Sequence, residues 1–286
     1  MRSRVKVFLT AAVVLFVMVI AFETHVLKVE YVEVPVAGLP ESFDGFRIVL
    51  VSDLHGRRIS PNGKAARAAA KANPDVIAAT GDFVHGGAGD MEAVLPFLRR
   101  LTEIAPVYAT SGNHEHWTNW PAIAEILDKN GIHVLENRHI QIDRGGDLLI
   151  LAGVGDPYTG HGDLEQALPE EINSPVVLLA HSPTWFEPGY QDIRGGTQDF
   201  MRQRELLEQV SLTLVGHTHG GQIKLPFIGA VTTASGRLFP KTHVEGLSLE
   251  ETGGWLYISR GMAQGGILAF RFLSRPELSV ITLLAD

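Results

Sequence analysis

The sequence contains no cysteine, and this absence excludes several kinds of chemistry. Disulfide scaffolds, iron–sulfur clusters, thiolate zinc sites and cysteine nucleophiles all require the missing side chain. An excess of positive charge is also missing, because 24 Lys and Arg stand against 32 Asp and Glu and give a net charge of −8. This balance argues against nucleic acid as a partner. Any polyanionic substrate must be held by something other than bulk charge, and bound metal cations are the obvious means.

What is present is the composition of a globular protein. The chain has 286 residues, of which 45% are apolar and 20% charged. This length allows one large domain or two small ones, and either can bury a sizeable core. We find no internal repeat and no convincing linker after about residue 30. One domain over residues 28–286 is therefore predicted.

The first 27 residues have the pattern of a membrane anchor. Basic residues open the chain at Arg2, Arg4 and Lys6. An almost unbroken apolar run follows from Val7 to Phe22, slightly shorter than the ~20 residues that span a bilayer. No small-residue cleavage site comes after it, which favours an uncleaved single-pass anchor in the cell membrane over a removed signal peptide or a core helix. The basic cluster predicts a cytoplasmic N-terminus and an extracytoplasmic domain.

Beyond the anchor, strands alternate with helices. A half-buried strand is predicted over 28–36. Short runs rich in Val, Ile and Leu predict strands buried on both faces over 46–53, 74–82, 105–113, 174–182 and 212–219. Helices are predicted over 62–72, 91–101, 121–130 and 200–209. Three further strands, over 254–261, 267–273 and 276–286, have no helices between them and are expected to close a second sheet.

Polar side chains follow five of these predicted strands directly. They are Asp53 and His55, Asp82, Asn113, His181, and His217 with His219. A single histidine in such a place is most often a hydrogen-bonded loop residue, but open α/β sheets build their sites at these strand ends. Nitrogen and oxygen donors without sulfur suit Zn²⁺, Mn²⁺ or Fe²⁺. Seven donors are too many for one tetrahedral ion and enough for two ions that share a carboxylate. The glycines before Asp82, Asn113 and His217 are expected to allow sharp turns.

Five blocks, DLH, GDF, GNHE, the lone His181 and GHTHGGQ, occur in the order typical of calcineurin-like metallophosphoesterases. From about residue 45 onward the chain resembles that family, and GHTHGGQIKLP with RFLSRPEL resembles its membrane-associated bacterial branch, typified by YkuE and YaeI. The resemblance implies an α/β fold, a four-layer αββα sandwich of two mixed β-sheets flanked by helices. It also implies hydrolysis of phosphodiester or pyrophosphate bonds by a hydroxide that bridges two metal ions.

The resemblance assigns roles to individual residues. One divalent ion would be held by Asp53, His55, Asp82 and His219, and the other by Asp82, Asn113, His181 and His217. His114 is the family's non-ligand histidine, and an imidazole with a near-neutral pKa suits protonation of the departing oxygen. Family members with GDxxD orient this histidine through the second Asp, whereas GDFVH has His85 there. Either another acid orients His114, or His114 is a weaker acid and poor leaving groups turn over slowly.

Other side chains have two readings each. Arg57 and Arg58 would clamp a phosphate oxygen or remain solvated loop residues. Five aromatic and imidazole side chains would form the floor of a substrate pocket or pack in the core. They are His116, Trp117, Trp120, Trp185 and Phe186. A Gly-rich polar segment, 187–198, is expected to be a surface loop near the mouth of the site.

Three functions remain open from the sequence. The first is a membrane-anchored two-metal phosphohydrolase, for which the resemblance to YaeI suggests UDP-2,3-diacylglucosamine as a lipid-linked candidate substrate. That substrate is cytoplasmic, which conflicts with an extracytoplasmic domain. The second is a phosphomonoesterase acting on phosphoproteins or small phosphates. The third is a non-catalytic metal-binding module, which is disfavoured because all seven predicted ligands are present. No oligomeric state is predicted.

Overall fold

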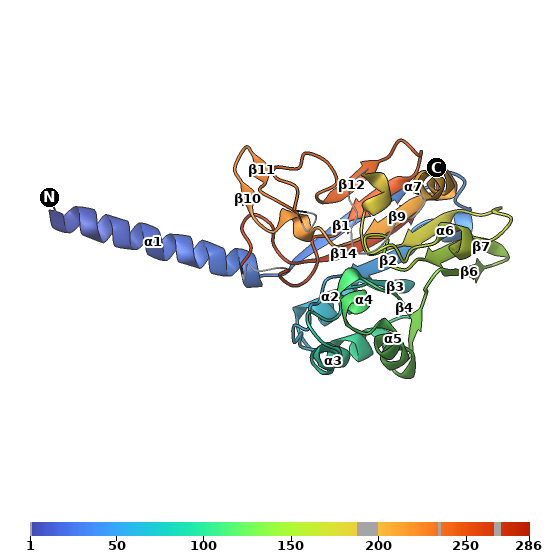
Figure 1. The fold of residues 1–286 in the computed structure, drawn as a ribbon, viewed down its shortest axis with the longest axis horizontal. Helices are drawn as coiled ribbons and strands as arrows, with labels where there is room; N and C mark the ends of the chain where they lie inside the picture. The colour runs from blue at the N-terminus through green and yellow to red at the C-terminus, as the bar shows by residue number, and fades with distance from the viewer. Residues whose placement is uncertain (1, 188–199, 234–235, 266–269) are drawn as a thin grey trace.

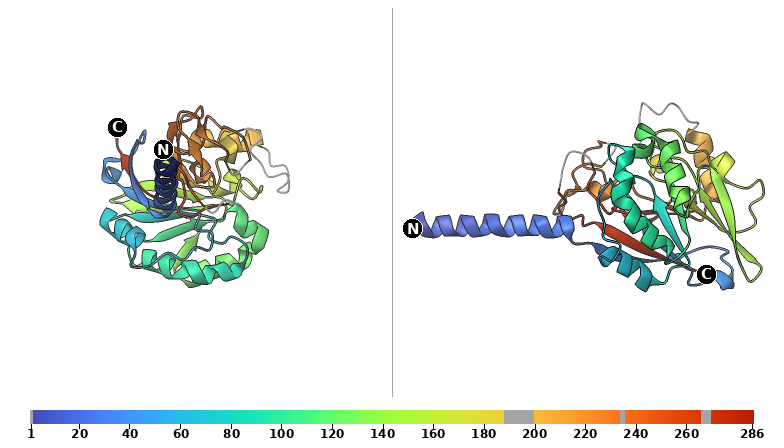
Figure 2. Two further views of the ribbon diagram at one scale, coloured as in Figure 1. Left: turned by 90° about the vertical axis from the view of Figure 1, so that its left-hand side faces the viewer. Right: turned by 90° about the horizontal axis from the view of Figure 1, so that it is seen from below.

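The computed structural model describes residues 2–187, 200–233, 236–265 and 270–286. Within them, two six-stranded mixed sheets lie face to face between layers of helices (Figures 1 and 2). The first sheet contains, in spatial order, β1 (Lys28–Pro35), β14 (Glu277–Leu284), β2 (Arg47–Val51), β3 (Val76–Thr80), β4 (Val107–Thr110) and β5 (Ile132–Val134). The second contains β12 (Gly246–Leu249), β13 (Trp255–Ile258), β9 (Leu212–Val215), β8 (Val176–Leu179), β7 (Asp147–Gly153) and β6 (Arg138–Arg144).

The central strands are apolar on both faces because both faces are buried. On β2, Val49 and Val51 pack toward the helices, while Ile48 and Leu50 pack toward the second sheet. The covering helices on this side are α2 (Lys64–Ala72), α3 (Met91–Thr102) and α5 (Trp120–Lys129). The second sheet is covered by α6 (Leu164–Ala167) and α7 (Phe200–Leu206). The predicted sandwich of two mixed sheets flanked by helices is confirmed.

Parallel pairing sets the direction of the strands that carry the polar residues. β2, β3 and β4 are parallel to one another, and so are β8 and β9 in the other sheet. Parallel strands bring their carboxyl ends to one edge of a sheet. Because the two sheets are stacked, the carboxyl-end loops of both can meet in one place.

The C-terminal part of the chain differs from the prediction. β13 joins the second sheet, but β14 lies in the first sheet, antiparallel to β2 and parallel to β1. The strand predicted over 267–273 is wrong where the chain is described, because residues 270–273 form only one bridge, between Phe272 and Ile223. Residues 267–269 lie outside the described residues, as does the predicted loop after Glu187.

The N-terminal segment forms helix α1 (Arg2–His25), which projects away from the domain (Figures 1 and 2). Its residues Arg4–His25 are long and apolar enough to cross a membrane, by length and composition. Of these residues only Thr24, near the C-terminal end of the helix, is buried against the rest of the protein. An exposed apolar helix of this length is costly in water, since its side chains remain unpacked.

Candidate metal centre

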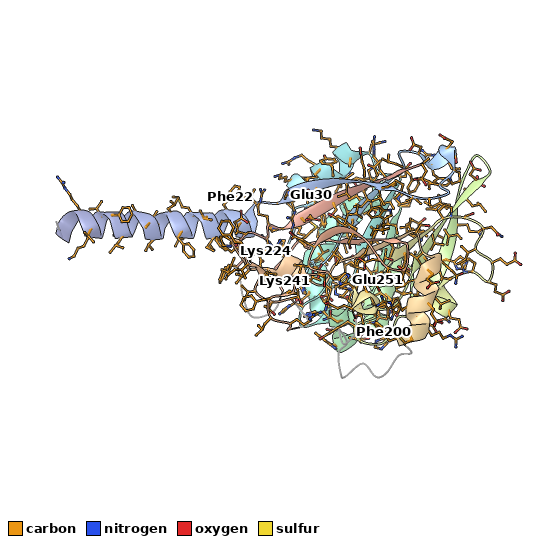
Figure 3. The ribbon with its side chains drawn as sticks, turned by 90° about the horizontal axis from the view of Figure 1, so that it is seen from above. Phe22, Glu30, Phe200, Lys224, Lys241 and Glu251 are labelled. Carbon is orange, nitrogen blue, oxygen red and sulfur yellow. The ribbon has the colours of Figure 1, made fainter. Side chains whose placement is uncertain are left out.

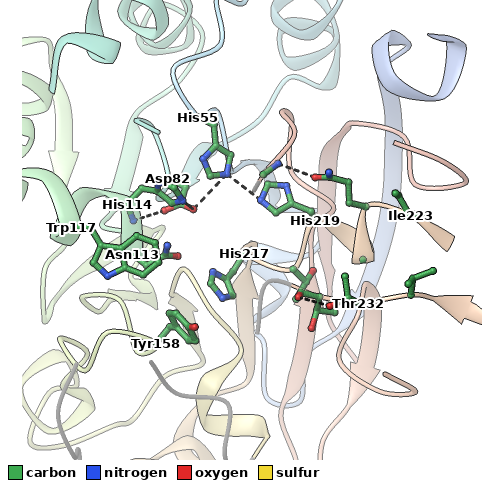
Figure 4. Close-up of a pocket in the computed structure, with 16 residues that line it drawn as sticks. His55, Asp82, Asn113, His114, Trp117, Tyr158, His217, His219, Ile223 and Thr232 are labelled. Atoms are coloured by element: carbon green, nitrogen blue, oxygen red, sulfur yellow. Dashed lines mark hydrogen bonds and ion pairs between the residues drawn. The ribbon is translucent and has the colours of Figure 1, made fainter. Parts of the chain in front are cut away.

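The seven predicted ligands lie together where the carboxyl ends of five strands meet, and Figure 4 shows five of them: His55, Asp82, Asn113, His217 and His219. Asp53 and His55 follow β2, Asp82 follows β3, Asn113 follows β4, His181 follows β8, and His217 and His219 follow β9. All seven side chains belong to buried residues. The site therefore joins loops of the first sheet to loops of the second.

Asp53, His55 and His219 form one group of facing donor atoms. Nε2 of His55 lies 3.1 Å from Nε2 of His219, and Nε2 of His219 lies 3.5 Å from Oδ1 of Asp53. The oxygen and nitrogen atoms of the three side chains lie within 4.8 Å of one another. Distances of this size allow one cation to contact all three.

Asp82, His181 and His217 form a second group, with Asn113 beside it. Nδ1–H of His181 donates to the carbonyl of Thr80, so Nε2 of the neutral ring carries a lone pair. That Nε2 lies 3.1 Å from Oδ1 of Asn113, 3.3 Å from Oδ2 of Asp82 and 3.1 Å from Nδ1 of His217. Lone pairs that converge in this way repel one another unless a proton or a metal cation lies between them. The donor set therefore fits a cation.

Asp82 connects the two groups. Its Oδ2 lies 3.6 Å from Nε2 of His55 and 3.3 Å from Nε2 of His181, so one carboxylate oxygen faces both. Its Oδ1 accepts a hydrogen bond from the backbone N–H of His114. A carboxylate held in this way is suited to bridge two cations.

Burial controls the protonation of the site. Burial lowers the pKa of His55 and of His219 to about 3 and places the pKa of His217 well below its usual value. Burial also opposes charge on His181, but the neighbouring Asp82 carboxylate raises the pKa of His181 well above its usual value. Most imidazoles are thus neutral, the form that binds metal ions. Metal binding at the second group must displace the proton that His181 shares with Asp82.

Strained backbone accompanies the predicted ligands. Five of the seven have a positive φ in the left-handed region: Asp53, His55, Asp82, His217 and His219. Residues with a Cβ adopt this conformation at a cost of about 1–3 kcal/mol each, and such strain concentrates at functional sites. The strain turns each side chain from its strand end toward the common centre.

The glycines before the ligands act differently from the prediction. Only Gly81 has a positive φ, whereas Gly112 is extended, with φ −111° and ψ −179°. A Cβ on Gly112 would lie 2.6 Å from the backbone nitrogen of Asp82 and 3.0 Å from Cγ of His181. Close approach of the two sheets therefore requires glycine there, rather than a sharp turn.

His114 is oriented by a backbone carbonyl. Its Nδ1–H donates to the carbonyl oxygen of His85 at 2.6 Å. Its ring stacks on the ring of His85 and contacts the ring of Trp117 at a tilt of 57°. Among the described residues no carboxylate orients this ring: the nearest one, Asp82, lies 4.0 Å from Nε2. Of the two alternatives for GDFVH, the structure favours a histidine oriented without an acid.

Glu115 is a buried residue whose role the sequence did not reveal. Its carboxylate accepts hydrogen bonds from the backbone N–H groups of Asp82, Val84 and Gly112. It therefore ties the loop after β3 to the loop after β4. Burial and the charge of Asp82 raise the pKa of Glu115 to about 7. Its presence in the GNHE block was the only available signal, because its partners lie in two separate loops.

A pocket of about 500 Å³ opens over the metal centre (Figure 4). Five of the seven candidate ligands and His114 line it, together with Ile223, Val231, Thr232 and Thr233. Of the aromatic candidates, Trp117 lines this pocket, whereas Trp185 and Phe186 belong to the core beside the second sheet.

Arg57 and Arg58 do not line the described pocket. The guanidinium of Arg57 instead lies 3.4 Å from Nδ1 of His25, at the end of α1, and Arg58 is exposed. Of the remaining candidates, Trp120 packs in the core beside the first sheet, and His116 stacks on His161. The structure thus brings together the seven ligands, His114 and Trp117, but not the two arginines.

Comparisons with known proteins agree with this geometry. Residues 46–221 match the family model described as calcineurin-like phosphoesterase. The chain is 30% identical over 282 residues to the "Transmembrane protein with metallophosphoesterase domain" of Danio rerio, covering 90% of this chain and 57% of that one. It is 29% identical to the "Uncharacterized metallophosphoesterase YkuE" of Bacillus subtilis, covering 91% and 87%, and 30% identical to the "Phosphodiesterase YaeI" of Escherichia coli, covering 83% and 82%. The chain thus spans little more than half of the Danio rerio protein.

Proposed function

Because the chain belongs to the calcineurin-like phosphoesterase family, whose members are metal-dependent, we propose that it is a membrane-anchored phosphohydrolase with a two-metal centre. The bonds cleaved would be phosphodiester or pyrophosphate bonds. The observation that carries the proposal is the position of Asp82, whose Oδ2 faces both His55 and His181. A single carboxylate between two groups of metal-binding side chains is the arrangement that two adjacent cations require.

The charge of the donor set explains how an acidic protein would hold a phosphate. Among the seven candidate ligands only Asp53 and Asp82 are carboxylates, so the protein contributes two negative charges. Two divalent cations, of Mn²⁺, Zn²⁺ or Fe²⁺, would supply Lewis acidity for the phosphoryl oxygens and lower the pKa of water. The donor set leaves a net positive charge at that point, which attracts an anion despite the overall charge of −8.

His114 would donate the proton to the leaving oxygen. It lines the pocket beside Asp82, and its Nδ1–H is engaged by the carbonyl of His85, which leaves Nε2 for the substrate. A neutral carbonyl stabilises the protonated ring less than a carboxylate would. We therefore expect aryl esters, whose leaving groups need little protonation, to react much faster than alkyl esters.

The proposed substrate is a lipid-linked phosphodiester or pyrophosphate. Apolar side chains of Trp117, Ile223 and Val231 line the pocket together with the candidate ligands, a combination that suits a phosphate carrying an apolar group. Anchoring by α1 would raise the local concentration of such a substrate. A hydrolysis screen of phosphomonoesters, aryl and alkyl diesters and UDP-2,3-diacylglucosamine, with each metal in turn, tests this choice. A clear preference for monoesters would favour a phosphomonoesterase instead.

Asp82→Asn tests the two-metal centre itself. Removal of the shared negative charge should reduce bound metal to one ion per chain or fewer and lower kcat/KM by about a hundredfold or more. Elemental analysis of the purified protein and hydrolysis of an aryl phosphodiester give the two readouts. Asp147→Asn, at the exposed start of β7, is the matched control and should change neither. Full activity in Asp82→Asn would contradict the proposed two-metal centre.

The orientation in the membrane is also proposed. The basic residues before the apolar run favour a cytoplasmic N-terminus and an extracytoplasmic domain. A C-terminal reporter active only outside the cytoplasm should therefore be active. Activity of a cytoplasmic reporter would reverse the orientation and make a cytoplasmic substrate such as UDP-2,3-diacylglucosamine accessible.

A further inference from the structure

Exposed apolar residues gather on one hairpin of the domain. Strands β10 (Lys224–Leu225) and β11 (Gly229–Ala230) pair to form this hairpin, and its turn exposes Leu225, Phe227 and Ile228, with Phe227 fully exposed. In the segment 270–273, Phe270 and Leu273 are exposed as well. Apolar side chains grouped in this way on a surface mark a contact with another apolar phase or a partner.

The hairpin and the segment 270–273 form one unit. Lys224 donates its backbone N–H to the carbonyl of Phe272 at 2.9 Å, and Phe272 donates its backbone N–H to the carbonyl of Gln222 at 3.0 Å. The ring of Phe272 also contacts the ring of Phe16 in α1, with centroids 6.2 Å apart. The hairpin is thus linked through Phe272 to the apolar helix, and Figure 1 shows β10 and β11 beside the end of α1.

The contact between Phe16 and Phe272 indicates how deep Phe272 would lie in a membrane that α1 crosses. Phe16 lies six residues before Phe22, the last residue of the apolar run, and six residues of α-helix rise about 9 Å. If α1 crosses a bilayer, the ring of Phe272 lies beside a part of the helix that is already within the apolar layer. Interfacial elements enter a membrane by about 5–10 Å, which agrees with this depth.

Cationic side chains surround the end of α1. Lys64 donates to the carbonyl of Leu27 at 2.8 Å, and Arg275 donates to the carbonyls of Val26 and Leu27 at 2.9 Å and 3.2 Å. Arg57 lies beside His25 at the same end. Figure 3 shows Lys224 on the side of the domain from which Phe22 and α1 leave. Cations next to an apolar surface match the order of layers in a membrane, in which phosphate headgroups lie next to the acyl chains.

The same hairpin reaches the pocket. Ile223 and Val231, at the bases of its two strands, line the pocket over the metal centre, while Phe227 and Ile228 are exposed at its turn. We propose that the β10–β11 hairpin and residues 270–273 insert into the lipid bilayer beside α1, so that the pocket receives a phosphate-bearing amphiphile from the membrane surface. This inference rests on the proposed anchoring by α1. The lipid bilayer is the one partner proposed for the exposed apolar surface of the hairpin and residues 270–273.

A single labelled cysteine tests the insertion without reference to activity. The natural chain has no cysteine, so Phe227→Cys in the full-length protein gives one site for a nitroxide label. In vesicles of phosphatidylcholine and phosphatidylglycerol, the label at position 227 should be accessible to oxygen and protected from a water-soluble nickel reagent. The control is Asp147→Cys, exposed on β7 at the end of the domain away from α1 in Figure 1, whose label should show the reverse.

Each outcome has a defined meaning. If the label at position 227 is as accessible to the nickel reagent as the label at position 147, the insertion is overturned, even if the protein hydrolyses its substrate. Protection from both oxygen and nickel would indicate a protein contact, such as a second copy, and also overturns it. A full-length chain that fails to float with the vesicles overturns both the insertion and the proposed anchor.

An activity comparison separates the insertion from the chemistry. Phe227→Asp combined with Ile228→Asp should lower hydrolysis of a phosphodiester lipid in vesicles by about tenfold or more, since the pocket loses its position at the surface. Hydrolysis of a soluble aryl phosphodiester should stay within about twofold, because neither residue lines the pocket. Leu249→Asp, at another exposed apolar residue, should leave both rates unchanged. Equal loss on both substrates, or none on the lipid, overturns the inference.

Discussion

At the scale of single residues, Gly112 shows how the site constrains its neighbours. Its backbone is extended, so alanine would fit the conformation, but the added Cβ would press on Asp82 and His181. We predict that Gly112→Ala lowers kcat/KM by about a hundredfold, since displacements near 1 Å at a catalytic site can cost that much. Steady-state hydrolysis and metal content check this.

Gly86→Ala is the matched control for that substitution. Gly86 lies in the neighbouring loop, has open space around its Cβ position and has no positive φ. Its replacement should leave both the rate and the metal content unchanged. Equal losses in the two variants would show that glycine flexibility, rather than close approach to Asp82, is what the site requires.

The orientation of His114 gives a second prediction at this scale. Because the carbonyl of His85 holds Nδ1–H, His85→Ala keeps the hydrogen bond and loses only the ring contacts with His114 and His55. Ring stacking contributes about 0.5–1.5 kcal/mol, so kcat/KM should fall by about tenfold or less.

His114→Ala should lower the rate on alkyl phosphodiesters by about 10²–10⁴, and less on aryl ones. Hydrolysis rates of each variant on alkyl and aryl phosphodiesters test both predictions. Equal loss on the two substrate classes in His114→Ala would contradict the proposed role of His114 as the proton donor.

At the scale of elements, Arg271 joins the C-terminal segment to the metal centre. Its buried guanidinium donates to the carbonyls of Arg260, Ser274 and His219, and it lies 3.2 Å from Nδ1 of His219. Its backbone N–H donates to the hydroxyl of Thr24 at the end of α1. Burial lowers the pKa of Arg271 to about 10, so it remains charged at neutral pH. One residue thus connects α1, the loop after β13 and a candidate ligand.

We predict that Arg271→Met destabilises the domain by about 3–5 kcal/mol, because several buried carbonyls lose their donor. For a domain of this size, that corresponds to a fall in Tm of roughly 6–20 °C. Added Mn²⁺ should also raise its Tm less than that of the natural protein, since His219 is no longer held in place. Arg275→Met, which affects only contacts at the end of α1, should retain the full response to Mn²⁺. Equal responses in the two variants would contradict the role of Arg271.

How far the helices and strands could be predicted depends on which property each sequence pattern indicates. Apolar runs report burial, and the runs that became β2, β3, β4, β8 and β9 are strands because they are buried on both faces. The run at β7 has the same character and could have been identified. The run over 267–273 misled because its apolar residues in the described part contact α1 or solvent instead of a sheet, with Arg271 buried among polar partners. Backbone strain at the ligands has no signal in the sequence.

At the scale of the whole molecule, the site exists only because the two sheets are stacked. Asp53, Asp82 and Asn113 come from the first sheet, and His181 and His217 come from the second. The order of strand-end residues predicted their convergence, since parallel strands share an edge. The insertion of β14 between β1 and β2 could not be predicted, because it depends on pairing between the two ends of the chain. The carbonyl that orients His114 was equally invisible, since no side chain specifies it.

A centre between two sheets should couple metal binding to the stability of the entire domain. A cation held by Asp82 and His181 links the sheets, and a ligand at a thousand times its Kd stabilises the folded state by about 4 kcal/mol. At roughly 2–4 °C per kcal/mol, removal of each ion by a chelator should lower Tm by roughly 8–16 °C, and restored Mn²⁺ should reverse the change. Differential scanning calorimetry of the full-length protein measures this. Asp147→Asn should respond like the natural protein, whereas Asp82→Asn should show a smaller shift. An unchanged Tm after complete removal of metal would mean that the two sheets are not joined through this centre.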